Sequence, residues 1–187
     1  MDALAARFSL KDLGPLNFFL GVKVLPLADN IILSQSKYIR EILKDFGMDD
    51  INGVSTLLST PTPLQHEDGS ALTDTKQYRS AFGKLQYLAF TRPNISFAVN
   101  KLSQFMHKPK MIHRQAVKHL LHYLKKTINY GLLLRRQCEK ALHIYSNADR
   151  AGDVNDRYST SAYVIYFGFN PINWSSEKQR TVAKSST

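Results

Sequence analysis

The longest run without an acidic residue covers residues 75–138, which hold 13 Lys and Arg and no Asp or Glu. Whatever structure this run forms must therefore expose polar faces of a single charge sign. Residues 1–74 balance to −4 and residues 139–187 to +1, so the net charge of +10 arises in this one segment. A field of one positive sign attracts polyanions, and nucleic acid is the usual one. The alternative is a basic surface that keeps the protein soluble and has no ligand.

Length and composition exclude several classes of protein. A chain of 187 residues, 43% of them hydrophobic, is long enough for one ordinary domain or two small ones and too apolar to be wholly disordered. No uncharged apolar run approaches the ~18 residues of a membrane span, so we expect no membrane partner. The N-terminus lacks the pattern of a signal peptide, and Cys138 is the only cysteine. We therefore expect an intracellular protein, cytoplasmic or nuclear and not secreted.

The first fifty residues predict a β-hairpin followed by a helix. Residues 16–25 are rich in β-branched and aromatic side chains and end at Pro26, and residues 31–35 have the character of a returning strand. Residues 36–47 then carry apolar side chains at helical spacing, with Gly47 suited to the C-terminal cap. This order predicts a strand–turn–strand–helix unit.

The acid-free segment predicts three consecutive helices. A connector with several Pro and Gly residues, 51–73, precedes them, and Asp74 with Gln77 resembles a capping box at the start of the first helix. The first helix is expected to stop just before Pro93, because that residue suits the first position of the second helix. The second helix is expected to run to about His107.

The third of these helices, residues 111–128, has an apolar side and a cationic side. The apolar stripe is expected to face the core and consists of Val117, Leu120, Leu121 and Leu124. The neighbouring stripe is expected to lie along a phosphate backbone and consists of Arg114, Lys118, His122 and Lys125, widened by His119 and Lys126. For one helix a solvated face would be the usual interpretation, but three consecutive acid-free helices favour nucleic-acid binding.

The C-terminal segment changes from helical to strand character. Apolar runs at 132–134, 142–146, 161–167 and 172–176 are separated by turn residues and predict an antiparallel meander. A sheet needs a covering layer on its inner face, and no covering helices follow these strands, so we expect an incomplete sheet. The predicted fold class is therefore α+β, with a β-hairpin, a basic three-helix region and an incomplete antiparallel sheet.

Six stretches together resemble the Pol polyprotein of copia-type retrotransposons, especially those of plants. They are FSLKDLGPLNFFLGVKV, ILSQSKYIREIL, TPTPL, YRSAFGKLQYLAFTRPNISFAVNKLSQFM, HRQAVKHLLHYLKKTINYGL and the C-terminal run that starts at YSNADRAGD. They occur in the order of the family and cover nearly the whole chain. As a set they are highly specific, although no one of them would be specific alone.

The resemblance implies the end of a reverse transcriptase followed by the start of its tethered ribonuclease H. Residues 1–50 would be the end of the palm, and residues 51–73 an extended connector. Residues 74–138 would be the basic thumb and connection, which hold the template–primer. Residues 139–187 would be a truncated ribonuclease H-like domain.

The resemblance also implies a second contact with nucleic acid in the first hairpin. Phe18, Phe19, Leu20 and Gly21 match the primer grip, which holds the primer end near the polymerase site. The implied partner is an RNA–DNA hybrid or another duplex, within a protein that includes the rest of the Pol polyprotein.

Neither metal-dependent reaction of this family has its full set of carboxylates here. The polymerase carboxylates of the family lie in a Tyr-Val-Asp-Asp-type motif that does not occur in this sequence, and Asp49 and Asp50 are predicted to form a turn. Asn147 stands where the family has its first ribonuclease H Asp, and an amide brings no negative charge to the Mg²⁺ ions of the intact enzyme. We therefore expect no metal or cofactor, and a chain that is catalytically inactive alone.

Two further groups of polar residues are predicted to be structural. Asp153 and Asp156 are expected to serve the turn that follows the first strand of the meander. A metal site at His113, His119 and His122 is disfavoured, because no Cys, Asp or Glu is near in sequence and the surrounding cations would repel a metal ion.

The leading hypothesis is a retrotransposon reverse transcriptase–ribonuclease H segment that binds duplex nucleic acid without cutting or copying it. One alternative is a part of a longer active polymerase and ribonuclease H polyprotein. Another is a host interaction module without a nucleic-acid role. The salt dependence of binding distinguishes the first hypothesis from the last, because electrostatic binding weakens as salt rises.

Overall fold

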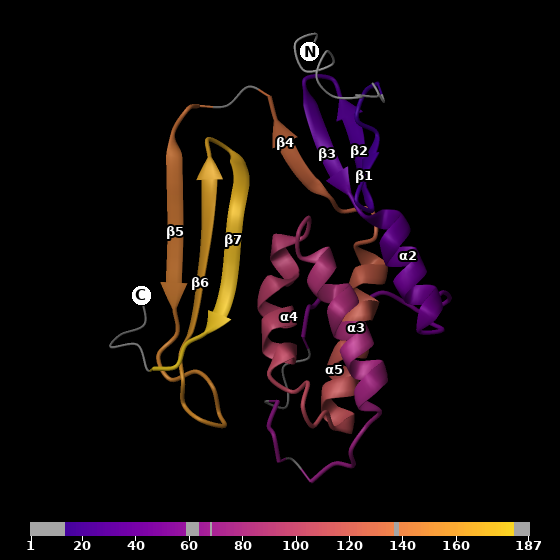
Figure 1. Ribbon diagram of the computed structural model, residues 1–187, viewed down its shortest axis with the longest axis vertical. Helices are drawn as coiled ribbons and strands as arrows, with labels where there is room; N and C mark the ends of the chain where they lie inside the picture. Colours follow the sequence, from indigo (N-terminus) through magenta and orange to yellow (C-terminus); the bar gives the residue numbers. More distant parts are fainter. Residues whose placement is uncertain (1–13, 59–63, 68, 137–138, 182–187) are drawn as a thin grey trace, which may run out of the picture.

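The computed structural model describes residues 14–58, 64–67, 69–136 and 139–181, so Cys138 lies outside the described residues. It has an α+β architecture, which confirms the expected class. A four-stranded antiparallel sheet lies above a group of helices in Figure 1, and a three-stranded antiparallel sheet lies to their left.

The four-stranded sheet joins both ends of the helical region. It has the order β1 (Phe18–Phe19), β2 (Val22–Leu27), β3 (Asn30–Ser34) and β4 (Leu132–Arg135). The hairpin of β2 and β3 confirms the predicted strand–turn–strand unit. Its first strand is interrupted, however, because Leu20 and Gly21 both have positive φ and reverse the chain between β1 and β2.

The prediction that residues 132–134 belong to the C-terminal meander was wrong. They form β4, which pairs with β3 in the first sheet through Leu132 with Leu33 and Leu134 with Ile31. The pattern of apolar residues indicates a strand but does not specify the strand with which it pairs. Here the partner strand lies about a hundred residues earlier in the chain.

The helices begin and end close to the predicted residues. They are α2 (Ser36–Asp45), α3 (Thr75–Leu88), the 3-10 turn η1 (Pro93–Ile95), α4 (Ser96–Ser103) and α5 (Met111–Lys126). The Asp74 side chain accepts hydrogen bonds from the backbone N–H groups of Lys76 and Gln77, so it caps α3 as predicted. The second helix is shorter than expected, since α4 ends at Ser103 rather than near His107.

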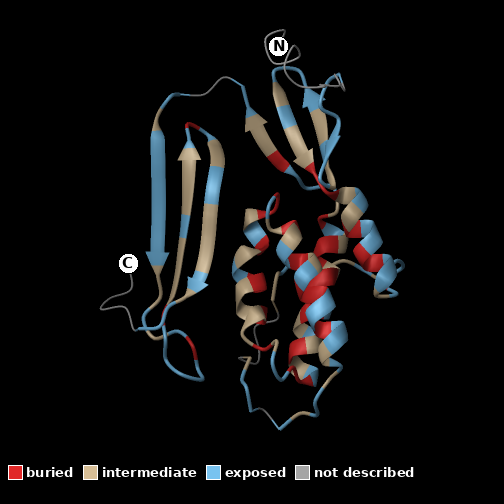
Figure 2. Ribbon diagram, viewed as in Figure 1, coloured by how far each residue is buried: buried red, intermediate tan, exposed pale blue. Residues whose placement is uncertain are grey.

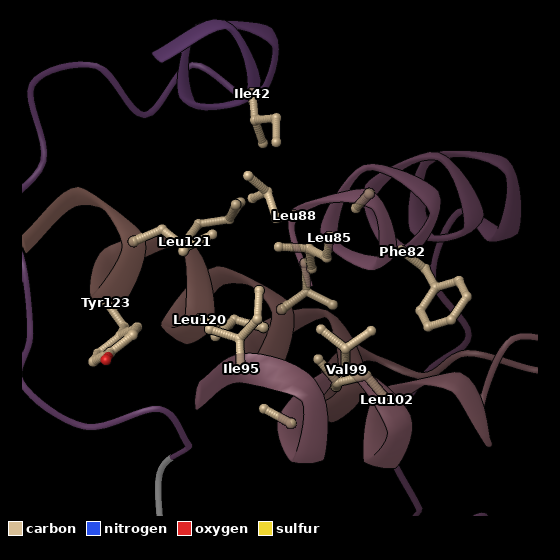
Figure 3. Close-up of a cluster of buried hydrophobic side chains, with 14 of the residues drawn as sticks. Ile42, Phe82, Leu85, Leu88, Ile95, Val99, Leu102, Leu120, Leu121 and Tyr123 are labelled. Atoms are coloured by element: carbon tan, nitrogen blue, oxygen red, sulfur yellow. The ribbon is translucent and has the colours of Figure 1, made fainter. Parts of the chain in front are cut away.

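The hydrophobic core lies among the helices. Figure 2 shows that the buried residues concentrate in α2 to α5, whereas β5 is almost wholly exposed. Side chains from the four α-helices and from η1 form this core, as Figure 3 shows, and they include Ile42, Leu85, Leu88, Ile95, Val99, Leu102, Leu120 and Leu121. None of the helices in the described part of the chain has both the length and the apolarity to cross a bilayer.

The three-stranded sheet contacts the helices through β7. Its order is β5 (Leu142–Ala148), β6 (Thr160–Phe167) and β7 (Asn170–Lys178), with β7 nearest to α4 (Figure 1). The indole Nε1 of Trp174 donates to the carbonyl oxygen of Ala89 at 3.0 Å, and the Asn100 amide donates to the carbonyl oxygen of Ser176. These contacts fix the sheet against the helical region.

Candidate nucleic-acid interface

Helix α5 carries the predicted apolar and cationic stripes on neighbouring faces. Val117, Leu120, Leu121 and Leu124 are all buried, which confirms the apolar stripe. Because the helix turns by about 100° per residue, this burial aims the adjacent cationic stripe away from the centre of the core.

The C-terminal half of the cationic stripe contacts residues 49–54, at the start of the chain that follows α2, rather than open solvent. The His122 Nδ1 donates to the carbonyl oxygen of Asn52 at 2.7 Å, and Lys125 Nζ donates to the carbonyl oxygen of Asp49. The backbone N–H of Val54 donates in turn to the carbonyl oxygen of His122 at 3.2 Å. Two of the predicted phosphate contacts therefore have partners within the protein.

The remaining cations of α5 differ in how accessible they are. Lys118 and Lys126 are exposed, and Arg114 is half-buried beside Asp74 and Gln77 at the start of α3. Arg114 and Lys118 are four residues apart, so they lie one turn apart on the same side of the helix. The accessible positive charge of α5 is thus centred on Lys118, with Lys126 near the helix end.

Acidic residues from other segments neutralise part of the acid-free region. Lys84 pairs with Asp45, Lys101 with Asp153 at 2.7 Å, and Lys110 with Glu67 at 2.6 Å. The sequence places these acids outside residues 75–138, and folding brings them to the helices. Sequence counting therefore overstates the free positive charge of the helical region.

Arg92 is another cation of this region that does not reach the surface. Only 2% of it is exposed, and its guanidinium donates to the carbonyl oxygen of Thr127 at 3.0 Å and to the Thr127 hydroxyl at 2.8 Å. Burial lowers the pKa of Arg92, although its hydrogen bond and charge interaction with Tyr123 partly oppose that effect. Arg92 is therefore a structural link between the start of η1 and the end of α5.

The hairpin residues of the predicted primer grip form an exposed apolar turn. Phe18, Phe19 and Leu20 are 56–69% exposed. The Tyr87 hydroxyl of α3 donates to the carbonyl oxygen of Leu20, and a Cβ added at Gly21 would lie 3.3 Å from that hydroxyl oxygen. The structure thus brings the turn against α3, and its role in holding a primer stays a prediction.

Asn147 lies on the exposed β5 strand opposite Ala162. The nearest carboxylate in sequence, Asp149, accepts a hydrogen bond from the Thr160 N–H at 2.6 Å and therefore serves the turn between strands. Within the described ranges, no group of three His, Cys, Asp or Glu residues could hold a metal ion. An amide without an accompanying carboxylate does not fit the two-Mg²⁺ chemistry of ribonuclease H.

Asp153 and Asp156 hold the turn that follows β5, as predicted. Asp153 accepts from the backbone N–H of Asn155 at 2.8 Å, and Asp156 accepts from that of Tyr158 at 3.0 Å. The ion pairs of Asp153 were not predicted: its 1% exposed side chain also lies 2.7 Å from Lys101 Nζ and 3.1 Å from Lys178 Nζ. The turn is therefore tied to both α4 and β7.

The electrostatics of Asp153 follow from these contacts. Burial alone would raise the pKa of this carboxyl group, but hydrogen bonds from Lys101, Asn155 and Lys178 outweigh that effect and hold the pKa well below its usual range. Burial would also lower the pKa of Lys178, and its pairing with Asp156 and Asp153 raises it instead. Asp153 and Lys178 are therefore both charged at neutral pH.

The three histidines of α5 have structural partners. His113 is buried and stacks on Phe105 with ring centroids 3.9 Å apart. Its Nδ1 accepts from the Lys110 N–H, and its Nε2 lies 2.9 Å from the carbonyl oxygen of Gln65. His119 Nε2 lies 2.9 Å from the Thr56 hydroxyl, so the connector contacts this residue as it contacts His122.

Comparison with known proteins identifies close relatives over the whole chain. The chain is 46% identical over 187 residues to the Retrovirus-related Pol polyprotein from transposon RE1 of Arabidopsis thaliana, and 43% identical to that from transposon RE2 of the same plant. Both alignments cover 100% of this chain and 13% of the relative, so the chain spans about an eighth of the length of these polyproteins. No solved structure matches.

Two further matches bear on the family. The chain is 38% identical to the Uncharacterized mitochondrial protein AtMg00810 of Arabidopsis thaliana, over 98% of this chain and 76% of that protein. Residues 1–60 match the family described as "Reverse transcriptase (RNA-dependent DNA polymerase)". Three findings agree: the motifs, the identity to two transposon polyproteins over the whole of this chain, and the family match of residues 1–60. The chain therefore belongs to the family of copia-type retrotransposon Pol polyproteins, and its N-terminal part matches the reverse transcriptase.

Proposed function

We propose that this chain binds RNA–DNA hybrid or other duplex nucleic acid without regard to sequence, through the helical region of α3 to α5. The main support for this proposal is that residues 75–138 contain no acidic residue, while Lys118 and Lys126 are exposed on α5. Lysine and arginine contacts to phosphates supply most of the affinity of such binding and carry no direct sequence information.

The internal contacts of the helical region narrow the proposed surface. Because His122 and Lys125 bind the backbone carbonyls of Asn52 and Asp49, the proposed phosphate contacts of α5 are Arg114, Lys118 and Lys126. Arg114 and Lys118 lie about 6 Å apart along the helix axis, so both can reach one nucleic-acid backbone. The proposed interface is therefore the accessible part of the predicted stripe.

Binding to a hybrid and to an unrelated duplex tests this proposal. Replacing Arg114, Lys118 and Lys126 together by Ala should weaken binding to both ligands by a similar factor. A matched control replaces Lys37, Arg40 and Lys44 of α2, which removes the same charge from exposed positions on another helix. Equal losses in the two triple variants would contradict the proposed surface, and binding that salt does not affect would favour a host interaction module.

We further propose that the chain alone does not hydrolyse the RNA strand of a hybrid. The side chains around Asn147 support this, since Asp149 is engaged by the Thr160 N–H and the residues that the structure describes contain no group of three His, Cys, Asp or Glu that could hold a metal ion. Incubation of the hybrid with the chain and Mg²⁺ or Mn²⁺ should leave the RNA intact. Metal-dependent cleavage that an Asn147→Ala variant loses would contradict this proposal.

The relatives suggest the setting in which such binding would operate. The chain aligns with 13% of each transposon polyprotein, so we propose that in a longer Pol protein it would hold a duplex for active sites elsewhere in that protein. Adding the separate chain to a reaction of a processive reverse transcriptase tests this proposal. DNA synthesis should slow as the chain is added, because a chain that holds the duplex competes with the polymerase for it.

A further inference from the structure

A groove of about 780 Å³ lies where the three-stranded sheet meets the helices. Its walls come from α3, α4 and β7, which are held together at this point by the Trp174 to Ala89 and Asn100 to Ser176 hydrogen bonds. The volume is within the range of about 300–1,000 Å³ that is typical of small-molecule sites in proteins. None of the residues discussed above as phosphate contacts lines it.

Aromatic rings form the apolar part of the groove. Phe82 and Gln86 lie one turn apart on α3, and Phe90, which is 70% exposed, follows in the turn just after the helix. Trp174 lines the groove from β7, and its hydrogen bond to Ala89 fixes the indole ring in place. An exposed ring and a fixed indole that line the same groove offer flat surfaces on which a planar ligand can stack.

The polar part of the groove consists mainly of uncharged side chains, and two of its hydroxyl groups have no hydrogen-bond partner in the described part of the chain. The buried hydroxyl oxygens of Ser96 and Ser176, on two different walls, have no hydrogen-bond partner among the described residues. Gln86 and Asn173 add side-chain amides, which can both donate and accept. These groups suit a ligand that is flat and uncharged and that carries donors and acceptors along its edge.

The charges in and around the groove select the class of ligand. Among the described residues Glu177 is the only ionisable one that lines the groove, so a phosphate group is disfavoured inside it. The α3 and α4 walls nevertheless belong to the acid-free segment, whose positive field attracts polyanions to this surface. A base of a nucleic-acid strand fits both the groove, which disfavours phosphate, and the positive surface around it. The base can enter the groove while the phosphates of the strand stay outside.

We infer that this groove binds one or more unstacked bases of a single-stranded segment that extends from the duplex. The inference rests on the proposed nucleic-acid binding and adds a preference for a ligand with a single-stranded extension over a blunt duplex. Aromatic stacking and edge contacts from hydroxyls and amides are the usual means by which proteins bind splayed-out bases.

The fluorescence of Trp174 gives a direct readout, because the chain contains a single tryptophan. Adenosine, which has a base but no phosphate, should change this fluorescence in a saturable manner. A blunt RNA–DNA hybrid should change it little, and the same hybrid with a single-stranded extension should change it strongly and bind about tenfold more tightly. A neutral peptide that saturates the signal when adenosine does not would overturn the inference.

Matched variants separate the groove from the phosphate surface. Phe90→Ala should abolish most of the advantage of the single-stranded extension and leave blunt-hybrid affinity unchanged. Phe97→Ala is the control, since Phe97 is a half-exposed aromatic residue of α4 that does not line the groove. Normal binding to the blunt hybrid, with no gain from the extension or with an equal gain in Phe90→Ala, would overturn the inference while leaving the proposed function intact.

Discussion

Arg92 donates two hydrogen bonds to Thr127, one to its carbonyl oxygen and one to its hydroxyl, and this pair joins the turn after α3 to the end of α5. The guanidinium also lies over the rings of Tyr123 and Tyr130, with its central carbon 6.0 and 5.6 Å from their centroids. A planar group with several donors in fixed directions can make these contacts together, whereas an ammonium group cannot.

Replacing Arg92 by Lys should therefore destabilise the fold by about 2 kcal/mol, because a buried charge keeps its desolvation cost but loses its paired hydrogen bonds. Urea unfolding measures the change in the free energy of unfolding. Arg79→Lys is the control, since Arg79 is exposed and makes one hydrogen bond, to the carbonyl oxygen of Met106. An equal, small effect for both variants would contradict the structural role of Arg92.

Asp153→Asn should be more costly, at about 3 kcal/mol, because it leaves the ammonium groups of Lys101 and Lys178 without their buried counter-charge. Asp156→Asn serves as the matched change, because Asp156 is exposed and exposed ion pairs contribute at most about 1 kcal/mol. Thermal or urea unfolding of the two variants measures how much each substitution lowers the free energy of unfolding. A larger loss in Asp156→Asn than in Asp153→Asn would contradict the role given to Asp153.

The pH dependence of stability should depend on the same residue. The pKa of Asp153 is lower in the folded protein than its usual value of 3.8, so its ion pairs stabilise the fold above about that pH. The contribution is lost as the pH falls further and the folded carboxylate takes up a proton. Wild-type protein should thus lose more stability than Asp153→Asn between neutral pH and strongly acidic pH, and parallel losses would argue against the ion pairs.

Two glycines should respond in opposite directions to substitution by Ala. A Cβ at Gly53 would lie 2.6 Å from the Lys126 Cβ and 2.7 Å from its backbone, so Gly53→Ala should push the connector off α5 and destabilise the protein by about 2 kcal/mol. Gly83 lies inside α3 with open space around a Cβ, so Gly83→Ala should stabilise it by roughly 0.5–1 kcal/mol. Unfolding curves of both variants compare the two sites directly.

Local features of the fold could be predicted because their causes are local. The Asp74 cap, the buried stripe of α5 and the positive φ of Gly47 at the end of α2 all depend on residues within a turn or two. The pairing of β4 with β3 could not be predicted, since the alternation of side chains in a strand does not specify a distant partner.

The candidate interface was predictable only as a helix face. The predicted polar stripe does lie on one side of α5, but the backbone carbonyls of Asn52 and Asp49 bind His122 and Lys125. Every residue type has a backbone carbonyl group, so no sequence pattern predicts which carbonyl a side chain will bind. The pairing of Lys84 with Asp45 likewise depends on how helices pack and not on spacing along the chain.

The salt dependence of binding to an RNA–DNA hybrid tests the central claim most directly. The logarithm of the association constant should fall linearly with the logarithm of the salt concentration, with a slope that changes by about 0.9 for each phosphate contact removed. The Arg114, Lys118 and Lys126 triple variant should therefore show a shallower slope than wild type, and the Lys37, Arg40 and Lys44 triple variant the same slope as wild type. An affinity that does not change with salt, or equal slopes in all three proteins, would contradict it.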